Sequence, residues 1–315
     1  MGIMNVLEIQ GLTKKFGNFV AVDNMTLNVK EGEIFGFLGS NGAGKSTTIN
    51  MISSLLQPSA GEIRILGKDS RKHSRHAKTN LGIVPQDLAI YDDMTAYENV
   101  AFFAGLYGLR GKLLKERTEE ALEFVGLGDR ARSRPSTFSG GMKRRLNIAC
   151  AIAHKPSLII MDEPTVGIDP QSRNYILESV KKLNESGCTV IYTSHYMEEV
   201  EEICSRVAIV DHGKIIADGT KEQLKAIITD VKDLSIELKP GSAYSLQSLS
   251  EIPGVRAVNE KEGRLSIQSD AAVDNLNRIL KSLMDGGAEV KALQEEEPNL
   301  ETVFLTLTGR SLRDQ

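Results

Sequence analysis

Tryptophan is absent from the 315 residues, and phenylalanine and tyrosine make up only 5% of them. The three cysteines, Cys150, Cys188 and Cys204, are odd in number and lack the spacing of a metal site, which indicates reduced thiols rather than a disulfide framework. Long apolar runs are also missing. Stretches such as IFGFLG and LIIM are far shorter than the roughly 20 residues of a membrane-spanning helix, so we expect no transmembrane segment.

Targeting signals and an excess of basic charge are missing as well. The N-terminal stretch MGIMNVLEIQGLTKKFG reaches charged residues too early for a secretory signal, and it lacks the Ser or Thr that N-myristoylation requires at the sixth position. A net charge of −4 gives no electrostatic case for a nucleic-acid partner. If the protein works at a membrane, we expect another protein to anchor it there.

Strand-like and helix-like segments alternate over the first part of the chain, which predicts an α/β core with a largely parallel sheet. Buried strands are expected at IFGFLG, LIIM and TVIYTS. A capping-box pattern, Thr95 followed by Glu98, predicts the start of a helix. Further helices are expected over residues 113–125, 142–153 and 173–184.

The character of the sequence changes after about residue 220. Strand, helix, strand, strand, helix and strand follow in that order, as in a ferredoxin-like split unit. We therefore predict a larger first domain at 1–225, with a helical subdomain at about 87–155, and a small C-terminal α+β domain at 226–315. The second domain shows no catalytic constellation, so we interpret it as an accessory domain for regulation or dimerisation.

The segment GSNGAGKS, residues 39–46, matches the full G-x-x-x-x-G-K-[ST] phosphate-loop pattern between an expected strand and an expected helix. Its glycines let the backbone form a nest of N–H groups at a helix N-terminus, which favours phosphate binding over the alternative of a flexible turn. Lys45 is expected to reach the β- and γ-phosphates of ATP, and Ser46 to hold Mg²⁺. The residues predicted to contact the nucleotide here are Gly39, Ser40, Asn41, Gly42, Ala43, Gly44, Lys45, Ser46 and Thr47.

Two carboxylates follow the buried strand LIIM, at the strand end where α/β sheets present ligand-binding groups. Asp162 has the character of the carboxylate that supports Mg²⁺ in phosphate-loop enzymes. Glu163 is then available to orient and polarise the attacking water. Without a phosphate loop the pair would be interpreted as solvated turn residues; its presence favours the catalytic interpretation.

Taken in order, the motifs resemble those of the ATP-binding subunits of ABC transporters over roughly residues 7–220. SGG at 139–141 resembles the signature motif of that family, and VPQD contains a residue similar to its Q-loop glutamine. GIDP resembles the D-loop, TSHYMEE contains a residue similar to the switch histidine, and LTKKFG contains an aromatic similar to the one that stacks on adenine. The residues assigned by this resemblance are Phe16, Gln86, Ser139, Gly140, Gly141, Asp169 and His195.

Each of these side chains also has a structural alternative. Phe16 fits either an adenine stack worth about 1–3 kcal/mol or a core position. Gln86 fits either a ligand of Mg²⁺ or the attacking water, or an ordinary strand-end amide. His195 follows TVIYTS and fits either a γ-phosphate contact or a structural role. Asp169 precedes Pro170 and fits either a contact across subunits or a helix cap.

The resemblance implies a dimer in which two head-to-tail domains enclose two ATP molecules. Ser139 and the N–H groups of Gly140 and Gly141 would hold the γ-phosphate of the ATP bound by the partner, although Ser139 also fits a simple helix cap. The family usually has Gln after the two glycines, and here the residue is Met142. We expect this departure to alter turnover or dimer affinity without abolishing activity.

The resemblance further implies an ATPase that uses ATP and Mg²⁺ and drives a separate permease from the cytoplasmic face of the membrane. Five of the sixteen Phe and Tyr residues lie between Tyr91 and Tyr107, which suits either a groove for a permease helix or the core of the helical subdomain. A soluble ABC protein of DNA repair, chromosome structure or translation is disfavoured by the single ATPase domain and the absence of heptads. A non-hydrolysing regulator is disfavoured by the intact Glu163 and His195.

The C-terminal segment EEEPNLETVFLTLTGRSL resembles the tail of exporters in the drug- and antibiotic-resistance branch, which includes the anthracycline and linearmycin resistance ATPases. In these systems the permeases are separate chains. The resemblance therefore implies export of a drug, antibiotic or other amphipathic compound. A lipid, polysaccharide or sodium exporter is the alternative within the same class.

Overall fold

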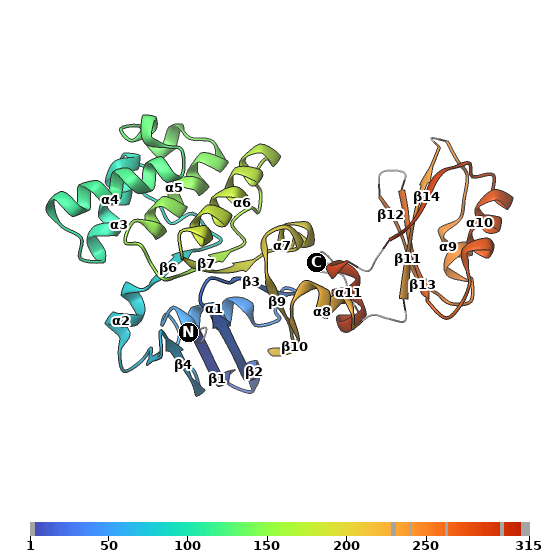
Figure 1. The fold of residues 1–315 in the computed structure, drawn as a ribbon, viewed down its shortest axis with the longest axis horizontal. Helices are drawn as coiled ribbons and strands as arrows, with labels where there is room; N and C mark the ends of the chain where they lie inside the picture. Colours follow the sequence, from blue (N-terminus) through green and yellow to red (C-terminus); the bar gives the residue numbers. More distant parts are fainter. Residues whose placement is uncertain (1–3, 228–230, 240, 262–263, 297–298, 310–315) are drawn as a thin grey trace. The chain divides into compact units, whose positions relative to one another are not determined.

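The computed structural model describes residues 4–227, 231–239, 241–261, 264–296 and 299–309 (Figure 1). The described chain forms two compact units, one up to Lys221 and the other from Glu222 onward. The sequence predicts two independent domains with the boundary between residues 225 and 226. Their independence stays a prediction. In the described part, no helix is both long enough and apolar enough to span a bilayer.

The larger sheet of the first unit has six strands in the order β10-β9-β3-β8-β7-β6. All neighbours pair in parallel except β10, which returns antiparallel from β9. This arrangement confirms the expected α/β core. The central strand β3 is buried along its whole length, as continuous apolar sequence predicts for a parallel sheet. The strands are β3 (Ile34–Gly39), β6 (Leu81–Val84), β7 (Leu158–Asp162), β8 (Thr189–Thr193), β9 (Arg206–Asp211) and β10 (Lys214–Gly219).

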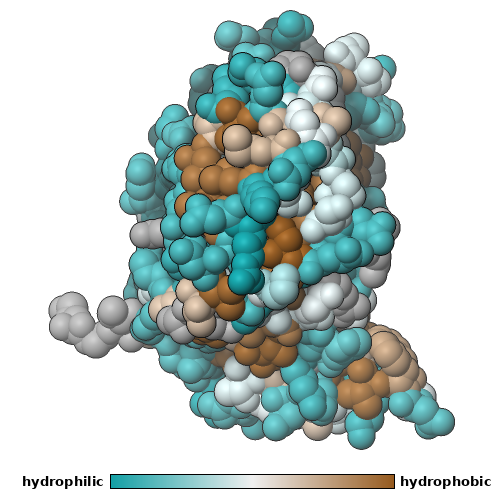
Figure 2. All heavy atoms as spheres, turned by 90° about the vertical axis from the view of Figure 1, so that its right-hand side faces the viewer, coloured by the Kyte–Doolittle hydropathy of each residue, from teal (hydrophilic) through white to brown (hydrophobic). Residues whose placement is uncertain are grey.

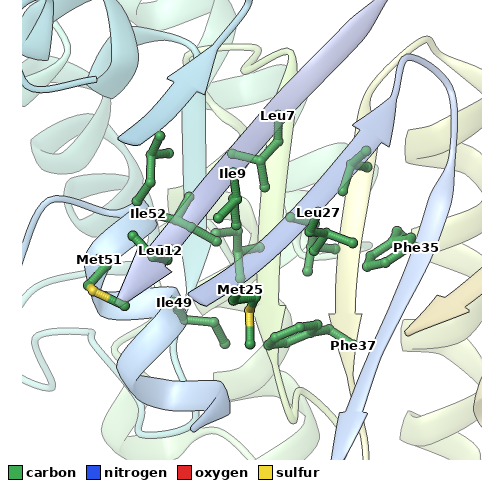
Figure 3. Packing of buried hydrophobic residues seen from close by; sticks show 14 of the residues in the cluster. Leu7, Ile9, Leu12, Met25, Leu27, Phe35, Phe37, Ile49, Met51 and Ile52 are labelled. Atoms are coloured by element: carbon green, nitrogen blue, oxygen red, sulfur yellow. The ribbon is translucent and has the colours of Figure 1, made fainter. Parts of the chain in front are cut away.

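A second, antiparallel sheet has the order β2-β1-β4-β5. Alternate residues of its long strands face the core, where they pack with residues of β3 and α1 (Figure 3). The phosphate loop connects β3 to α1, so this packing fixes both ends of the loop. The elements are β1 (Asn5–Phe16), β2 (Phe19–Lys30), α1 (Lys45–Ile52), β4 (Ala60–Ile65), β5 (Lys68–Asp69) and α2 (Ser74–Thr79).

The remaining helices of this unit include the expected helical region, and the Thr95–Glu98 capping box is confirmed at the start of α3. Helices α5 and α6 begin earlier than predicted, because Ser139 and Asp169 act as their N-caps. The elements are α3 (Ala96–Leu106), α4 (Gly111–Phe124), the 3₁₀ turns η1 (Gly128–Arg130) and η2 (Pro135–Thr137), α5 (Gly140–Ile152), α6 (Pro170–Glu185) and α7 (Met197–Ile203).

The second unit has an antiparallel sheet in the order β12-β13-β11-β14. This order and the βαββαβ sequence of elements confirm the expected ferredoxin-like fold. Helix α8 (Lys221–Lys225) spans the boundary between the units. The elements that follow are β11 (Val231–Leu238), α9 (Leu246–Ser250), β12 (Val255–Lys261), β13 (Arg264–Asp270), α10 (Leu276–Asp285), β14 (Val290–Glu296) and α11 (Leu300–Thr308). Of the tail that resembles resistance exporters, residues 297–298 and 310–312 lie outside the described residues.

The second unit has a hydrophobic core of its own, formed by strand residues and by the inner faces of α9 and α10. Its exposed apolar side chains include Leu246, Met284 and Leu293. The face of the molecule drawn in Figure 2 shows patches of hydrophobic residues among hydrophilic ones.

Candidate active site

The phosphate loop leaves the end of β3 and enters α1 through backbone conformations that favour glycine. Gly44 has a φ of 104°, and a Cβ at this position would lie 2.6 Å from the backbone oxygen of Ala21. Gly42 also has a positive φ, of 77°. A side chain at Gly44 would therefore be both strained and in collision, so the close approach of the loop to β2 depends on this glycine.

Lys45 lies at the first position of α1 and is only 6% exposed. Its Nζ donates hydrogen bonds to the carbonyl oxygens of Gly39 at 2.6 Å and Ser40 at 3.2 Å, so the ammonium group closes the loop upon itself. Burial lowers the pKa of Lys45, and the carboxylates of Glu163 and Asp162 oppose that shift. The amine is thus held beside the acidic pair, where a phosphate would meet it.

A buried hydroxyl in the loop fits a phosphate ligand. The Oγ atom of Ser40 is buried and has no hydrogen-bond partner within the described residues. A buried polar atom left in this state costs free energy unless a ligand or water meets it. The loop therefore offers a donor, an ammonium group and a helix N-terminus to one anion.

Glu163 joins three segments of the chain. Its Oε1 lies 2.7 Å from Nε2 of His195, and its Oε2 accepts a hydrogen bond of 3.0 Å from Nε2 of Gln86. The residue is 5% exposed and adopts a left-handed backbone with φ 48°. Its N–H donates to Oγ1 of Thr193 at 2.9 Å, which holds this uncommon conformation. Both carboxylate oxygens are thus fixed in direction.

Asp162 ends β7 beside Glu163, and its Oδ1 accepts a hydrogen bond of 2.7 Å from Oγ1 of Thr193. Burial is the main cause that raises the pKa of Asp162, and the charge of Glu163 raises it further. A bound cation would offset both effects, because a nearby positive charge favours the ionised carboxylate.

The oxygen donors at the site suit Mg²⁺. The hydroxyl of Ser46, the carboxylate of Asp162 and the amide of Gln86 are hard oxygen ligands, which Mg²⁺ prefers together with phosphate oxygens and water. The described residues contain no cluster of three His, Cys, Asp or Glu side chains, and a Mg²⁺ site of this type does not need one.

Most of these groups surround one cavity of about 350 Å³; the predicted metal ligand Asp162 does not line it. The structure brings the loop residues together with Phe16, Gln86, Glu163 and His195 around it. The predicted residues Gly39 and Ala43 do not line the cavity; they support the loop from behind. The lining residues are Phe16, Phe19, Ala21, Ser40, Asn41, Gly42, Gly44, Lys45, Ser46, Thr47, Gln86, Glu163 and His195.

Two aromatic rings stand at the edge of this cavity. Phe16 is 48% exposed, so it is not a core residue. Phe19 faces it across the turn between β1 and β2 and is also exposed. Both rings are therefore accessible to a planar base.

The residues predicted to form the signature and the D-loop lie in a separate cluster that does not line the cavity. The Ser139 hydroxyl accepts a hydrogen bond of 3.2 Å from N of Met142, and the Asp169 carboxylate accepts one of 2.9 Å from N of Ser172. The backbone N–H of Ser172 is the main cause that lowers the pKa of Asp169. Gly141 packs so closely on Ser172 that a Cβ there would collide with the Ser172 side chain. The first turns of α5 and α6 thus lie against each other.

Sequence reasoning missed four contributors to the site. Phe19 and Ala21 line the cavity, and Thr193 bonds the carboxylate of Asp162 and the backbone N–H of Glu163. Arg144 on α5 is buried and donates to the carbonyl oxygens of Pro85 at 2.8 Å and Gln86 at 2.6 Å. Phe19 could have been found, because it is a second aromatic residue three positions after Phe16. Arg144 could not, because nothing distinguishes it from the other basic residues around it.

The parallel sheet, the phosphate loop and the acidic pair at the end of β7 define a phosphate-loop nucleoside triphosphatase. Two family models match the chain. Residues 22–166 match the model described as ABC transporter, and residues 219–308 match that of the C-terminal domain of ATP-binding proteins similar to DrrA1-3.

Known proteins support the same assignment over nearly the whole chain. It is 46% identical to the linearmycin resistance ATP-binding protein LnrL of Bacillus subtilis, covering 98% of this chain and 100% of that one. It is 35% identical to the daunorubicin/doxorubicin resistance ATP-binding protein DrrA of Streptomyces peucetius, covering 98% and 94%. The chain belongs to the family of ABC transporter ATP-binding proteins, and it is an ATP-hydrolysing transporter subunit.

Solved structures of the family share the fold of the ATPase part. The ATP-binding subunit of an ABC transporter superposes with a TM-score of 0.65 at 30% identity, covering 70% of this chain and 92% of that one. A dimeric ATP-binding cassette in a post-hydrolysis state, bound to ADP and phosphate, superposes with a TM-score of 0.61 at 29% identity, covering 68% and 98%. ATPase domains of this family dimerise and work with membrane permease components.

Proposed function

We propose that two copies of this chain dimerise around two ATP molecules and drive a separate permease that exports a drug, antibiotic or other amphipathic compound. One observation supports the proposed dimer. The cavity of a single chain gathers the phosphate loop, Gln86, Glu163 and His195, whereas Ser139 and its neighbours do not line it. The signature residues thus remain available to the γ-phosphate held by a partner.

Within one site, each residue has a defined task. Lys45 and the N–H groups of the loop bind the β- and γ-phosphates, and Phe16 with Phe19 holds the base. Glu163 accepts a proton from the attacking water, and Gln86 and His195 fix the direction of its two oxygens.

The cation would be held by the oxygen donors of Ser46, Asp162 and Gln86. When bound, Mg²⁺ would neutralise the negative charge that develops on the phosphate oxygens. Removal of the γ-phosphate contact loosens the dimer, which couples hydrolysis to movement of the permease.

The helical region carries the surface proposed for the permease. Tyr91 and Phe102 are partly exposed, and their ring centroids lie 5.4 Å apart with an edge-on geometry. Leu88 and Leu106 nearby in the sequence are also exposed. An apolar, aromatic surface that follows Gln86 directly would receive a permease helix and sense the state of the site. We therefore infer that the subunit works at the cytoplasmic face of the membrane, as a peripheral protein.

The proposal that the exported compound is a drug or antibiotic is supported by the relatives, which include the linearmycin and daunorubicin/doxorubicin resistance proteins. A protein of Rhizobium sp. named for Nod factor export is also 37% identical over 97% of this chain and 98% of its own length. A lipid, polysaccharide or sodium exporter is the second candidate within the class. Resistance profiles of cells that lack the gene would separate these candidates.

Ser139→Asp tests the dimer without removing the helix cap, because Asp is as good an N-cap as Ser. The added negative charge would face the partner's γ-phosphate. We expect normal ATP binding by the monomer but loss of ATP-dependent dimerisation and turnover. Ser139→Asn is the matched control, since it keeps the cap and adds no charge. Equal turnover and dimerisation for the Asp and Asn variants, measured with sedimentation and phosphate release, would contradict the trans contact.

The proposed complex with a permease is tested by co-purification. The chain is purified from membranes together with the permeases encoded beside its gene. We expect one of them to retain the full chain, and Phe102→Glu to release it while ATP binding persists. If none co-purifies from membranes that retain transport, the transport role proposed here is wrong.

A further inference from the structure

A buried carboxylate that the proposed mechanism does not use lies behind the active site. Glu199, in the short helix α7, is 0% exposed. An ionisable side chain removed from water costs free energy unless its partners compensate. The partners of Glu199 therefore indicate why the fold retains it.

Four side chains meet this carboxylate. Its Oε2 accepts hydrogen bonds from the hydroxyl groups of Thr165 at 2.9 Å, Tyr192 at 2.8 Å and Ser194 at 2.7 Å. Its Oε1 forms a salt bridge of 2.7 Å with Nε of Arg173. Thr165, Tyr192 and Ser194 are all buried, so these contacts are screened from water.

The donors come from the segments that hold the catalytic groups. Thr165 follows Glu163 by two positions, and Arg173 lies in the first turn of α6, after the D-loop residue Asp169. Tyr192 belongs to β8, and Ser194 directly precedes His195. One carboxylate thus joins the segment after the general base to the segment before the switch histidine.

The loop that contains His195 is fixed on its other side as well. The Ser194 hydroxyl, which donates to Glu199, accepts a hydrogen bond of 3.0 Å from N of Tyr196. The guanidinium of Arg173 lies 4.8 Å from the ring centroid of Tyr196. His195 is therefore held from both neighbours by groups that end on Glu199.

We propose that Glu199 is a positioning residue that locks the segment after Glu163 to the switch-histidine loop, so that Nε2 of His195 stays in contact with Glu163. The proposal rests on the roles proposed above for Glu163 and His195. A core residue that merely filled space would need no convergence of donors from β8, α6 and both loops. Charge-assisted hydrogen bonds of this kind fix direction as well as distance.

The first test reads the position of His195 directly. The chain has only five histidines, so ring ¹⁵N resonances of the full-length protein can be assigned by single substitutions. In Glu199→Gln we expect the Nε2 resonance of His195 to move towards that of the exposed His73. Glu202→Gln removes another carboxylate from α7, one that pairs with Lys181, and should leave His195 unchanged.

Thr165→Val provides a milder variant if Glu199→Gln does not fold, because it removes a single donor at nearly constant volume. Thr165 lies thirty positions from His195 in sequence, so a shift of the His195 resonance in this variant supports the lock. Unchanged His195 resonances in every folded variant would overturn the proposal.

Turnover measurements distinguish the positioning role of Glu199 from the catalytic role proposed for His195. We expect Glu199→Gln to lower kcat about 10- to 100-fold with ATP affinity unchanged, since a displacement of about 1 Å in a catalytic group costs up to about 10²-fold. A displaced His195 with normal kcat would support the lock and reject the catalytic role of His195. Normal kcat together with an unmoved His195 would reject the lock itself.

Discussion

At the scale of single residues, Glu163 is the most constrained side chain of the site. Its backbone is left-handed, its N–H is bonded to Thr193, and its two oxygens meet His195 and Gln86. These contacts leave the carboxylate little freedom. A strained, fully oriented residue of this kind is typical of a catalytic group.

Glu163→Gln should therefore leave ATP binding intact and lower turnover roughly 10²–10⁴-fold, the usual contribution of a general base. The amide has the same size but cannot accept a proton from water. We expect the variant to accumulate as an ATP-bound dimer, which sedimentation with ATP would show. Lys45→Ala is the contrasting variant, because it should weaken ATP binding itself. Near-normal phosphate release by Glu163→Gln would remove Glu163 from this role.

The loop proposed to bind phosphate has a sequence pattern, because a loop of fixed length and glycine content is needed to cradle a phosphate. The residues that orient the site have none. Thr193 and Arg144 act only because β8 and α5 bring them beside segments far away in sequence. Their side chains carry no local pattern, since a buried arginine and a solvated one look alike in a basic run.

At the scale of elements, α5 connects the segment of Ser139 to the segment of Gln86. Its first turn begins at the Ser139 cap, and Arg144, one turn further, holds the backbone of Pro85 and Gln86. Burial lowers the pKa of Arg144, and Asp87 opposes that shift. A movement of α5 would therefore be transmitted to the backbone of Gln86.

Arg144→Met tests that connection. It removes two hydrogen bonds and leaves two carbonyl groups without this donor, so we expect a loss of about 2–4 kcal/mol in unfolding free energy. Turnover should also fall, because Gln86 loses its support. The matched control is Arg145→Met on the same helix, which loses a bond to the carbonyl of Val125 and should cost stability but spare turnover. Equal turnover losses in the two variants would argue against a specific link.

The element boundaries show what pattern reasoning could and could not supply. The ferredoxin-like order and the α/β core followed from hydrophobic periodicity alone. The starts of α5 and α6 were placed two and three residues late, at 142 and 173 instead of 140 and 170. The periodic apolar positions begin only after the first turn, whereas the caps at Ser139 and Asp169 set the actual start.

At the scale of the whole molecule, each of the two units has a hydrophobic core of its own among the described residues. The larger core combines both sheets of the first unit with α1, and the smaller lies within the second unit. The cavity with the phosphate loop belongs entirely to the first. Ligand binding stabilises only the cooperative unit that contains the site.

We therefore expect the full chain to unfold in two calorimetric transitions, of which ATP raises only the one that belongs to the first unit. At an ATP concentration 100 times its Kd, the free energy of unfolding of the first unit should increase by about 2.7 kcal/mol. A core substitution in the second unit, Ile267→Ala, should lower the other transition and leave the ATP-dependent one in place. Lys45→Ala should abolish the ATP response without affecting the second transition. If both transitions move together with ATP, the two units are energetically coupled, and the C-terminal unit responds to the nucleotide state.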